Sequence, residues 1–237
     1  MLRRLLDEWL APAARRRGLA RNPSTMEAAL ARCAARLPAL GTVIDVGASD
    51  GRWSRMASAI LPPARYFMVE ARAEHESGLK RTAERPGFSY RLCAAGDRDG
   101  TIHFDATELF GGLASETPPE RNGIEVPVRR LDGLAAEHRL AAPYAIKLDT
   151  HGYEVPILQG AGDLLRQAAL LVIECYYFEV APGALLAHEM CAWLAARGFR
   201  CVDLADPVHR PRDGALWQAD LFFAPQADPA FASGAFA

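Results

Sequence analysis

The chain has 237 residues, of which 50% are hydrophobic and 24% are charged, a composition typical of a packed globular protein. Its formal net charge is -2 at pH 7 and its sequence pI is ≈ 6.3, so it lacks the basic field that binding along a nucleic acid requires. We therefore expect no nucleic-acid partner.

The cysteines and the first residues indicate a cellular compartment. The five cysteines contain no C-x-x-C pair, which favours reduced thiols over a disulfide framework or a zinc ribbon. Acidic residues at Asp7 and Glu8 interrupt the first apolar stretch, and no apolar run reaches the roughly 20 residues that cross a bilayer. We expect a cytoplasmic protein without a signal peptide or a transmembrane segment. The amphipathic stretch 2–10 could contact a membrane surface, or pack on the domain as a helical cap.

Three parts follow one another along the chain. Residues 1–40 predict an N-terminal helical extension, whose second helix opens on the capping-box pattern STME at 24–27 and ends before Pro38. Residues 41–226 alternate between strand-like and helix-like patterns and predict one domain. Residues 227–237 are rich in Ala, Pro and Gly and predict a disordered tail.

The central part reads as repeated strand–helix–strand units, which are typical of a parallel sheet with helices on both faces. The predicted strands are 43–47, 66–70, 88–94, 144–149, 169–174, 199–204 and 217–224. The predicted helices are 53–60, 73–85, 132–138, 153–166 and 185–197. The expected fold class is α/β, a doubly wound and mostly parallel sheet of seven strands whose last strands form an antiparallel edge.

The middle of the chain departs from this alternation. Segments 101–104 and 125–129 read as extended, and a stretch rich in Gly, Pro and Ser separates them. Long loops in compact domains are often functional, so the loop 106–124 is expected near the site, either as a lid or as a variable insertion.

A glycine turn, DVGASDG at 45–51, directly follows the first predicted strand. Its glycines allow a tight turn and close approach to a ligand at the carboxyl edge of the sheet. A dinucleotide fold would place a glycine where Ser49 stands, and Asp45 and Asp50 put negative charge where a pyrophosphate would lie. The turn therefore disfavours NAD and favours a cationic ligand such as a sulfonium cofactor. The predicted contacts here are Asp45, Gly47, Ala48, Ser49 and Gly51.

Two further strand ends complete the predicted cofactor site. Glu70 ends the second strand, where a carboxylate can accept hydrogen bonds from both ribose hydroxyls, or else be a solvated strand end. After the third strand, Ala94 and Ala95 leave space for a flat base. Asp97 could accept a hydrogen bond from an adenine amino group, or belong to a plain turn.

Four titratable groups cluster at the end of the predicted strand 144–149. Lys147, Asp149, His151 and Glu154 are expected at the same sheet edge as the glycine turn. Because unpaired buried charge is costly, this cluster indicates a functional site. The alternative is a Lys147–Glu154 salt bridge beside an exposed His151.

In order and spacing, these motifs resemble those of the FkbM-type family of S-adenosylmethionine-dependent methyltransferases, which have class I, Rossmann-like folds. The matching segments are I-D-V-G-A-S-D-G at 44–51, V-P-V-R-R-L-D at 126–132, the K-x-D-x-x-G-x-E pattern within 146–161, and L-V-I-E at 171–174. The resemblance covers about residues 43 to 175. Ser49 stands where the family usually has Asn, and His151 stands where it often has Glu.

The resemblance implies transfer of a methyl group from S-adenosylmethionine, usually to a hydroxyl oxygen of a sugar, a lipid or a secondary metabolite. His151, with an ordinary pKa near 6.5, is our candidate base. Asp149 would orient it or contact the cofactor, and Lys147 would stabilise developing negative charge. Glu154 completes the predicted catalytic set.

Some assignments stay open in the sequence. Glu174 and Tyr176 are predicted to contact the substrate, and Glu174 could hold a divalent ion with Asp149, although no metal ligand set is predicted. The partner is expected to be a small-molecule acceptor, and no motif indicates its identity or the oligomeric state. An N-methyltransferase, a nucleotide-sugar enzyme and a non-catalytic cofactor-binding protein of the same fold remain as alternatives.

Overall fold

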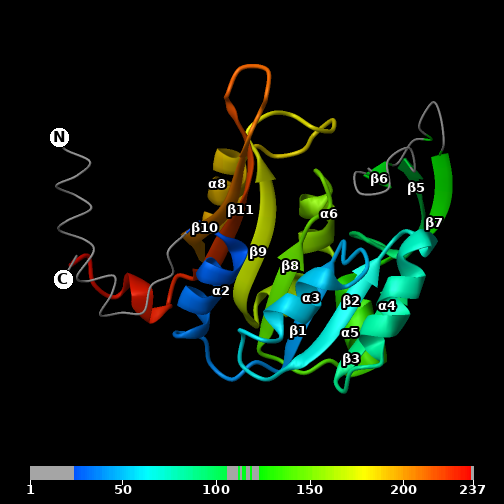
Figure 1. Cartoon of the computed structure of the whole chain (residues 1–237), viewed down its shortest axis with the longest axis horizontal. Coiled ribbons are helices and arrows are strands. Elements are labelled where there is room, and N and C mark those ends of the chain that lie inside the picture. Colours follow the sequence, from blue (N-terminus) through cyan, green and yellow to red (C-terminus); the bar gives the residue numbers. More distant parts are fainter. Residues whose placement is uncertain (1–23, 106–111, 113, 116–117, 119–122, 236–237) are drawn as a thin grey trace.

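The computed structural model of the chain describes residues 24–105, 112, 114, 115, 118 and 123–235 (Figure 1). Its strands form one sheet of seven strands and one of four. Figure 1 shows the large sheet through the middle of the molecule and the small sheet beyond its β2–β3 end.

The large sheet has the strand order β10-β11-β9-β8-β1-β2-β3. Its strands are β1 Thr42–Val46, β2 Arg65–Glu70, β3 Phe88–Leu92, β8 Tyr144–Leu148, β9 Ala168–Tyr176, β10 Phe199–His209 and β11 Leu216–Pro225. The strands from β3 to β9 pair in parallel, whereas β11 is antiparallel to both of its neighbours. The predicted fold class is therefore confirmed, including the antiparallel edge.

Helices cover both faces of this sheet. They are α2 Met26–Ala34, α3 Arg52–Ala57, α4 Glu76–Ala83, α5 Leu131–His138, α6 Glu154–Gln159, α7 Gly162–Leu165 and α8 Ala187–Ala195. Successive strand residues point to opposite faces. Val43 thus packs in the cluster that includes residues of α2 and α3, and Ile44 packs in the cluster that includes residues of α5 to α8.

Two charged residues interrupt the apolar central strands. Strands covered on both faces read as nearly continuous apolar runs, and every residue of β1 and β8 is buried. Asp45 of β1 and Lys147 of β8 break these runs and are direct partners in the parallel register. The fold therefore places a buried carboxylate beside a buried ammonium near the carboxyl edge.

The small sheet is built from the segment that departs from the alternation. It contains β4 Ala94–Ala95, β5 Gly100–Asp105, β6 Ala114–Ser115 and β7 Gly123–Arg129. The two segments predicted as extended pair antiparallel as β5 and β7. Of the predicted loop 106–124, the structure describes only positions 112, 114, 115, 118 and 123–124.

The helix predicted over 153–166 is two helices, α6 and α7. Gly160 lies between them, and a β-carbon there would collide with the carbonyl oxygen of Gly96. Asp132 caps the second helix, because its Oδ1 accepts from the backbone N–H groups of Asp163 and Leu164 at 3.1 and 3.2 Å. Similarly, the helix predicted over 73–85 begins with a 3₁₀ turn, η1 Ala73–His75.

The ends of the chain differ from the sequence expectation in detail. The N-cap of α2 is Thr25, whose Oγ1 accepts from the N–H of Ala28 at 3.3 Å, one residue later than the predicted capping box. The tail predicted to be disordered from 227 contains a 3₁₀ turn, η2 Pro229–Phe231. The amphipathic stretch 2–10 lies outside the described residues. Among the helices that are described, none is long and apolar enough to span a membrane.

Candidate functional site

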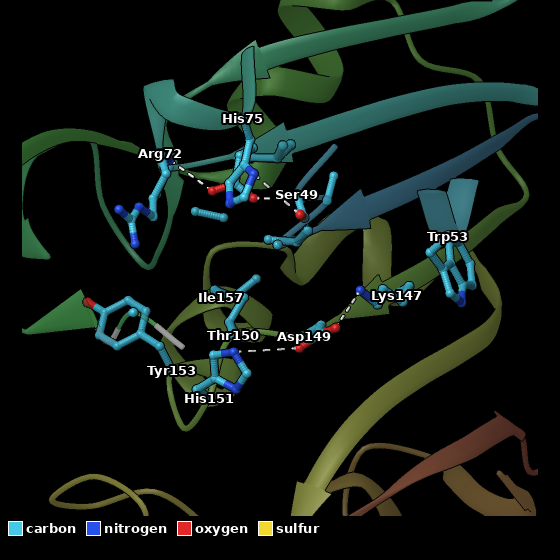
Figure 2. A pocket seen from close by; sticks show the side chains of 18 of the residues that line it. Ser49, Trp53, Arg72, His75, Lys147, Asp149, Thr150, His151, Tyr153 and Ile157 are labelled. Atoms are coloured by element: carbon cyan, nitrogen blue, oxygen red, sulfur yellow. Dashed lines mark hydrogen bonds and ion pairs between the residues drawn. The ribbon is translucent and has the colours of Figure 1, made fainter. Parts of the chain in front are cut away.

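A cavity of about 690 Å³ lies at the carboxyl ends of β1, β2 and β8, within the size range of small-molecule sites (Figure 2). Figure 2 shows Ser49 and His75 on one side of it, and Lys147, Asp149 and His151 on the other. Nine predicted site residues line it: Gly47, Ala48, Ser49, Glu70, Ala94, Ala95, Lys147, Asp149 and His151. Six predicted site residues do not: Asp45, Gly51, Asp97, Glu154, Glu174 and Tyr176.

The glycine turn is held against the end of β8. Gly47 has φ 73°, and a β-carbon there would collide with the carbonyl oxygen of Asp149. Gly51 has φ 80° and packs instead on Thr82 and Met68, where a β-carbon would come within 2.8 Å and 2.9 Å of side-chain atoms. The absence of a side chain at Gly51 therefore lets the turn pack on Thr82 and Met68. The absence of one at Gly47 lets the turn approach the backbone of Asp149 at the cavity.

Glu70 fixes the two loops that border the cavity. Its Oε2 accepts from the backbone N–H of Ser49 at 2.7 Å, and its Oε1 accepts from the backbone N–H of Arg72 at 2.8 Å. Each carboxylate oxygen has a second lone pair, so two further donors can bind. A ribose has two adjacent hydroxyl groups, so it could donate one hydrogen bond to each oxygen of Glu70.

Two of the three residues predicted to contact a base lie at the cavity. Ala94 and Ala95 line the cavity beside Cys93, and their small side chains leave room for a flat group. Asp97 lies outside the cavity, with its carboxylate 3.3 Å from the guanidinium of Arg98. The structure places Asp97 in the turn that leads to β5, as the alternative interpretation of this residue expects.

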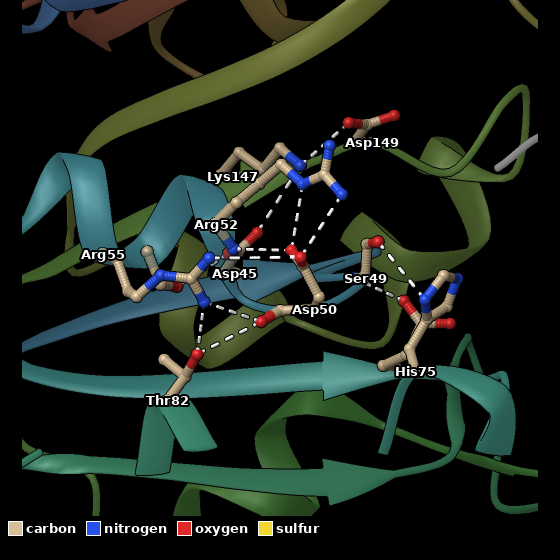
Figure 3. A network of polar contacts seen from close by, with 11 residues as sticks. Asp45, Ser49, Asp50, Arg52, Arg55, His75, Thr82, Lys147 and Asp149 are labelled. Atoms are coloured by element: carbon tan, nitrogen blue, oxygen red, sulfur yellow. Dashed lines mark hydrogen bonds and ion pairs between the residues drawn. The ribbon is translucent and has the colours of Figure 1, made fainter. Parts of the chain in front are cut away.

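Lys147 is the central cation of the site (Figure 3). Its Nζ lies 2.9 Å from Asp149 Oδ2 and 3.5 Å from Asp45 Oδ1, and its side chain is 4% exposed. Burial alone lowers the pKa of a lysine, but the charges of Asp149 and Asp45 outweigh it and raise the pKa of Lys147. Lys147 is therefore a permanent cation that joins two adjacent strands.

Asp45 is buried beneath the site. It is 0% exposed, and its Oδ2 accepts from Ser54 Oγ at 2.7 Å. Burial raises the pKa of Asp45, although Lys147 and Ser54 oppose the shift. The predicted contact between Asp45 and a cofactor is therefore corrected: this carboxylate holds Lys147 and α3.

His151 stands at the turn after β8 in a left-handed conformation, φ 53°, which is uncommon outside glycine. Its Nδ1 lies 3.0 Å from Glu174 Oε2, and its Nε2 lies 3.9 Å from Asp149 Oδ1. Burial lowers the pKa of the imidazole, but Glu174, Asp149 and Glu154 outweigh it and raise the pKa of His151 to about 9. His151 is therefore cationic at neutral pH in this structure, contrary to the ordinary value predicted from sequence.

Glu174 and Tyr176 lie behind His151 and outside the cavity. Tyr176 donates its hydroxyl hydrogen to Glu174 Oε2 at 2.7 Å, and its oxygen lies 2.7 Å from His151 Nδ1. Gln218 of β11 donates to the other oxygen of Glu174. The structure thus places both side chains against the imidazole and away from the cavity, where the substrate contact was predicted.

Glu154 is likewise structural. It is 4% exposed, and its Oε1 accepts from the N–H of Gly152 and from Thr150 Oγ1, both at 3.0 Å. These bonds close the turn that carries His151. The prediction of a direct catalytic role for Glu154 is corrected to one of holding this turn.

Asp149, His151 and Glu174 each offer one possible metal-ligand atom, and these atoms lie within 4.8 Å of one another. Both oxygens of Glu174 already accept hydrogen bonds, and His151 is held between the two carboxylates. The three groups therefore satisfy one another as an ion-pair network, with a proton on the imidazole.

Several cavity residues were missed by the sequence reading. Trp53, His75 and Tyr153 line it, as do Asp206 of β10 and Asp220 of β11. Only Asp220 carried a usable signal, a lone charge inside the apolar run of a predicted strand. The other four residues are far apart in the sequence and are recognised as cavity residues only in the folded chain.

A family model described as methyltransferase FkbM domain matches residues 45–201, more than half of the chain. No curated protein matches the chain. Among solved structures, the chain is similar to the methyltransferase FkbM from Methylobacillus flagellatus KT, with a TM-score of 0.51 and 17% identity. That alignment covers 77% of this chain and 43% of the other, so the chain spans less than half of that relative.

Two other solved structures are similar over most of both chains. Precorrin-6y C5,15-methyltransferase from Geobacter metallireducens GS-15 has a TM-score of 0.45 and 13% identity, covering 84% of this chain and 86% of that one. Sp1610 from Streptococcus pneumoniae, solved in complex with S-adenosyl-L-methionine, has a TM-score of 0.46 and 12% identity, covering 83% and 72%.

Replacing Lys147 tests the buried ion-pair cluster. Lys147→Met keeps most of the side-chain volume but leaves Asp45 and Asp149 without their cation, so we expect a loss of roughly 3–5 kcal/mol of unfolding free energy in urea denaturation. Arg52→Met is the matched control, because Arg52 pairs with Asp50 at the surface and its side chain is 64% exposed. It should cost less than about 1 kcal/mol. Equal losses would contradict the central role of Lys147.

Proposed function

Because the chain belongs to the FkbM methyltransferase family, we propose that it transfers a methyl group from S-adenosylmethionine to a hydroxyl oxygen of a small-molecule acceptor. One observation carries the proposal: the glycine turn, Glu70 and His151 all line one cavity. Sugars, hydroxylated lipids and secondary metabolites are the acceptor classes that we would test first.

The residues present fit the cofactor. S-adenosylmethionine supplies a methyl group already activated on a sulfonium centre, so the protein needs mainly to bind, orient and accept a proton. Glu70 would accept from the ribose hydroxyls, and the space beside Ala94 and Ala95 would receive the base. Asp149, which borders the same cavity, would face the positive charge.

His151 is the proposed base for the acceptor hydroxyl. An alcohol is a weak nucleophile while it keeps its proton, and a positioned imidazole can take that proton. Glu174 holds Nδ1, which leaves Nε2 for the acceptor. Because His151 is cationic in the free protein, it must first lose a proton. A positive charge bound beside Asp149 would favour that loss, since it offsets the carboxylate.

A substitution separates binding from chemistry. His151→Asn should lower methyl transfer by about 10²–10⁴-fold while S-adenosylhomocysteine binding, measured by calorimetry, stays within about twofold. The assay follows S-adenosylhomocysteine release with the acceptor that the wild-type protein methylates best. His188→Asn, at an exposed position on α8, is the control and should retain full activity. Full activity in His151→Asn would contradict base catalysis and favour an amine acceptor, which needs no such base.

The pH profile should report the environment of His151. Because the base acts only when neutral, kcat/KM should rise with pH and level off above about 9, the raised pKa of His151. Glu174→Gln removes a carboxylate that raises this pKa, so its rising limb should move toward lower pH. Glu179→Gln, at an exposed position, should leave the profile unchanged. A limb that stays in place in Glu174→Gln would argue against His151 as the titrating group.

A further inference from the structure

The cavity has an end that the nucleoside would leave unfilled. In Figure 2, Tyr153 and Trp53 lie on opposite sides of the pair Lys147–Asp149. The Glu70 side has the features that suit a ribose and a base. At the Trp53 end, Lys147 Nζ lies 5.8 Å from the centre of the indole ring.

Asp220 supplies a carboxylate to this cavity from β11, a strand that carries no part of the predicted motifs. Its backbone lies opposite Glu174 in the antiparallel register. Within the described part of the chain, its carboxylate makes no hydrogen bond and no ion pair closer than 4.0 Å. A half-buried carboxylate in this state is costly unless a ligand or water supplies a donor.

The charges around Asp220 are unbalanced. The ionisable groups that act on it are Lys147 of β8, Asp149 directly after β8, Glu174 of β9 and Asp206 of β10. Burial raises the pKa of Asp220 to about 7, and the three carboxylates add to the shift while Lys147 opposes it. One lysine thus faces Asp45, Asp149 and Asp220 together. A cation bound beside Asp220 would relieve its repulsion by Asp149, Glu174 and Asp206.

We propose that Asp220 binds the α-ammonium group of the cofactor's amino-acid end. This inference rests on the proposed function, since it takes the nucleoside to lie at Glu70. The rest of the cofactor would then cross Lys147–Asp149 toward Trp53, placing its sulfonium near Asp149 and its ammonium near Asp220. These two positive charges offset the local excess of carboxylate. Arg52 also lines the cavity, where its guanidinium pairs with the carboxylate of Asp50 (Figure 3).

Two nucleosides test the assignment directly. S-adenosylhomocysteine carries the amino-acid end, and methylthioadenosine has the same nucleoside and sulfur without it. Asp220→Asn should weaken S-adenosylhomocysteine binding at least about tenfold in calorimetry, because it removes a charge-assisted hydrogen bond. Methylthioadenosine binding should stay within about twofold, which also shows that the variant is folded.

Two control variants test whether the effect of Asp220→Asn is specific to the amino-acid end. Glu70→Gln should weaken both nucleosides, because both carry the ribose. Asp163→Asn removes an equal charge at an exposed position on α7 and should weaken neither. If Asp220→Asn weakens both nucleosides equally, or neither, the inference is wrong. If the wild-type protein binds neither nucleoside, the proposed function is wrong, and the inference, which rests on it, is wrong as well.

The wild-type protein offers a second readout that needs no variant. Because the pKa of Asp220 is raised to about 7, its carboxylate should be lost as the pH falls through that value, and S-adenosylhomocysteine should bind more weakly. Methylthioadenosine should show no such dependence, and the dependence should be absent in Asp220→Asn. Equal pH dependence for the two nucleosides would overturn the assignment.

Discussion

The buried ammonium of Lys147 is the constraint on which the site depends. The parallel register sets it beside Asp45, and the end of β8 sets it beside Asp149. A lone charge at this depth would be very costly, so the cation and its carboxylates have to be kept together. Because Gly47 packs directly on the backbone of Asp149, the same pairing also fixes the glycine turn against the strand that carries the catalytic candidates.

The arrangement of charge explains what kind of ligand the cavity suits. Glu70, Asp149 and Asp220 border it from three different strands, whereas the buried lysine is already shared by two carboxylates. Arg52 and Arg72 also line the cavity, but both pair with carboxylates, so the strand-end carboxylates favour a cation over a pyrophosphate. Carboxylates also explain why His151 holds a proton, since Glu174 and Asp149 stabilise the charged form of its imidazole. Binding of a cation and loss of that proton are therefore linked through Asp149.

Much of the fold and part of the site could be predicted from the sequence. Long apolar runs separated by helical periods specify a doubly wound sheet, and residues that end adjacent parallel strands must meet at one edge. That reasoning correctly brought Glu70 and His151 to one cavity. It could not tell how far down a strand the cavity reaches, so it placed Asp45 in the cavity instead of beneath it, covered by α3. It also missed Asp220: the lone charge in an apolar strand was visible, but the contact of that strand with the site depends on the register across the antiparallel edge.

The protonation state of His151 tests the account most directly, and it can be measured by ¹⁵N NMR of the imidazole during a pH titration. The carboxylates of Glu174 and Asp149 predict a pKa of about 9 for the imidazole of His151 in the free protein. S-adenosylmethionine, which carries the sulfonium charge, should lower that pKa more than S-adenosylhomocysteine, which lacks it. A pKa near the ordinary 6.5 in the free protein, unchanged by either ligand, would contradict the account.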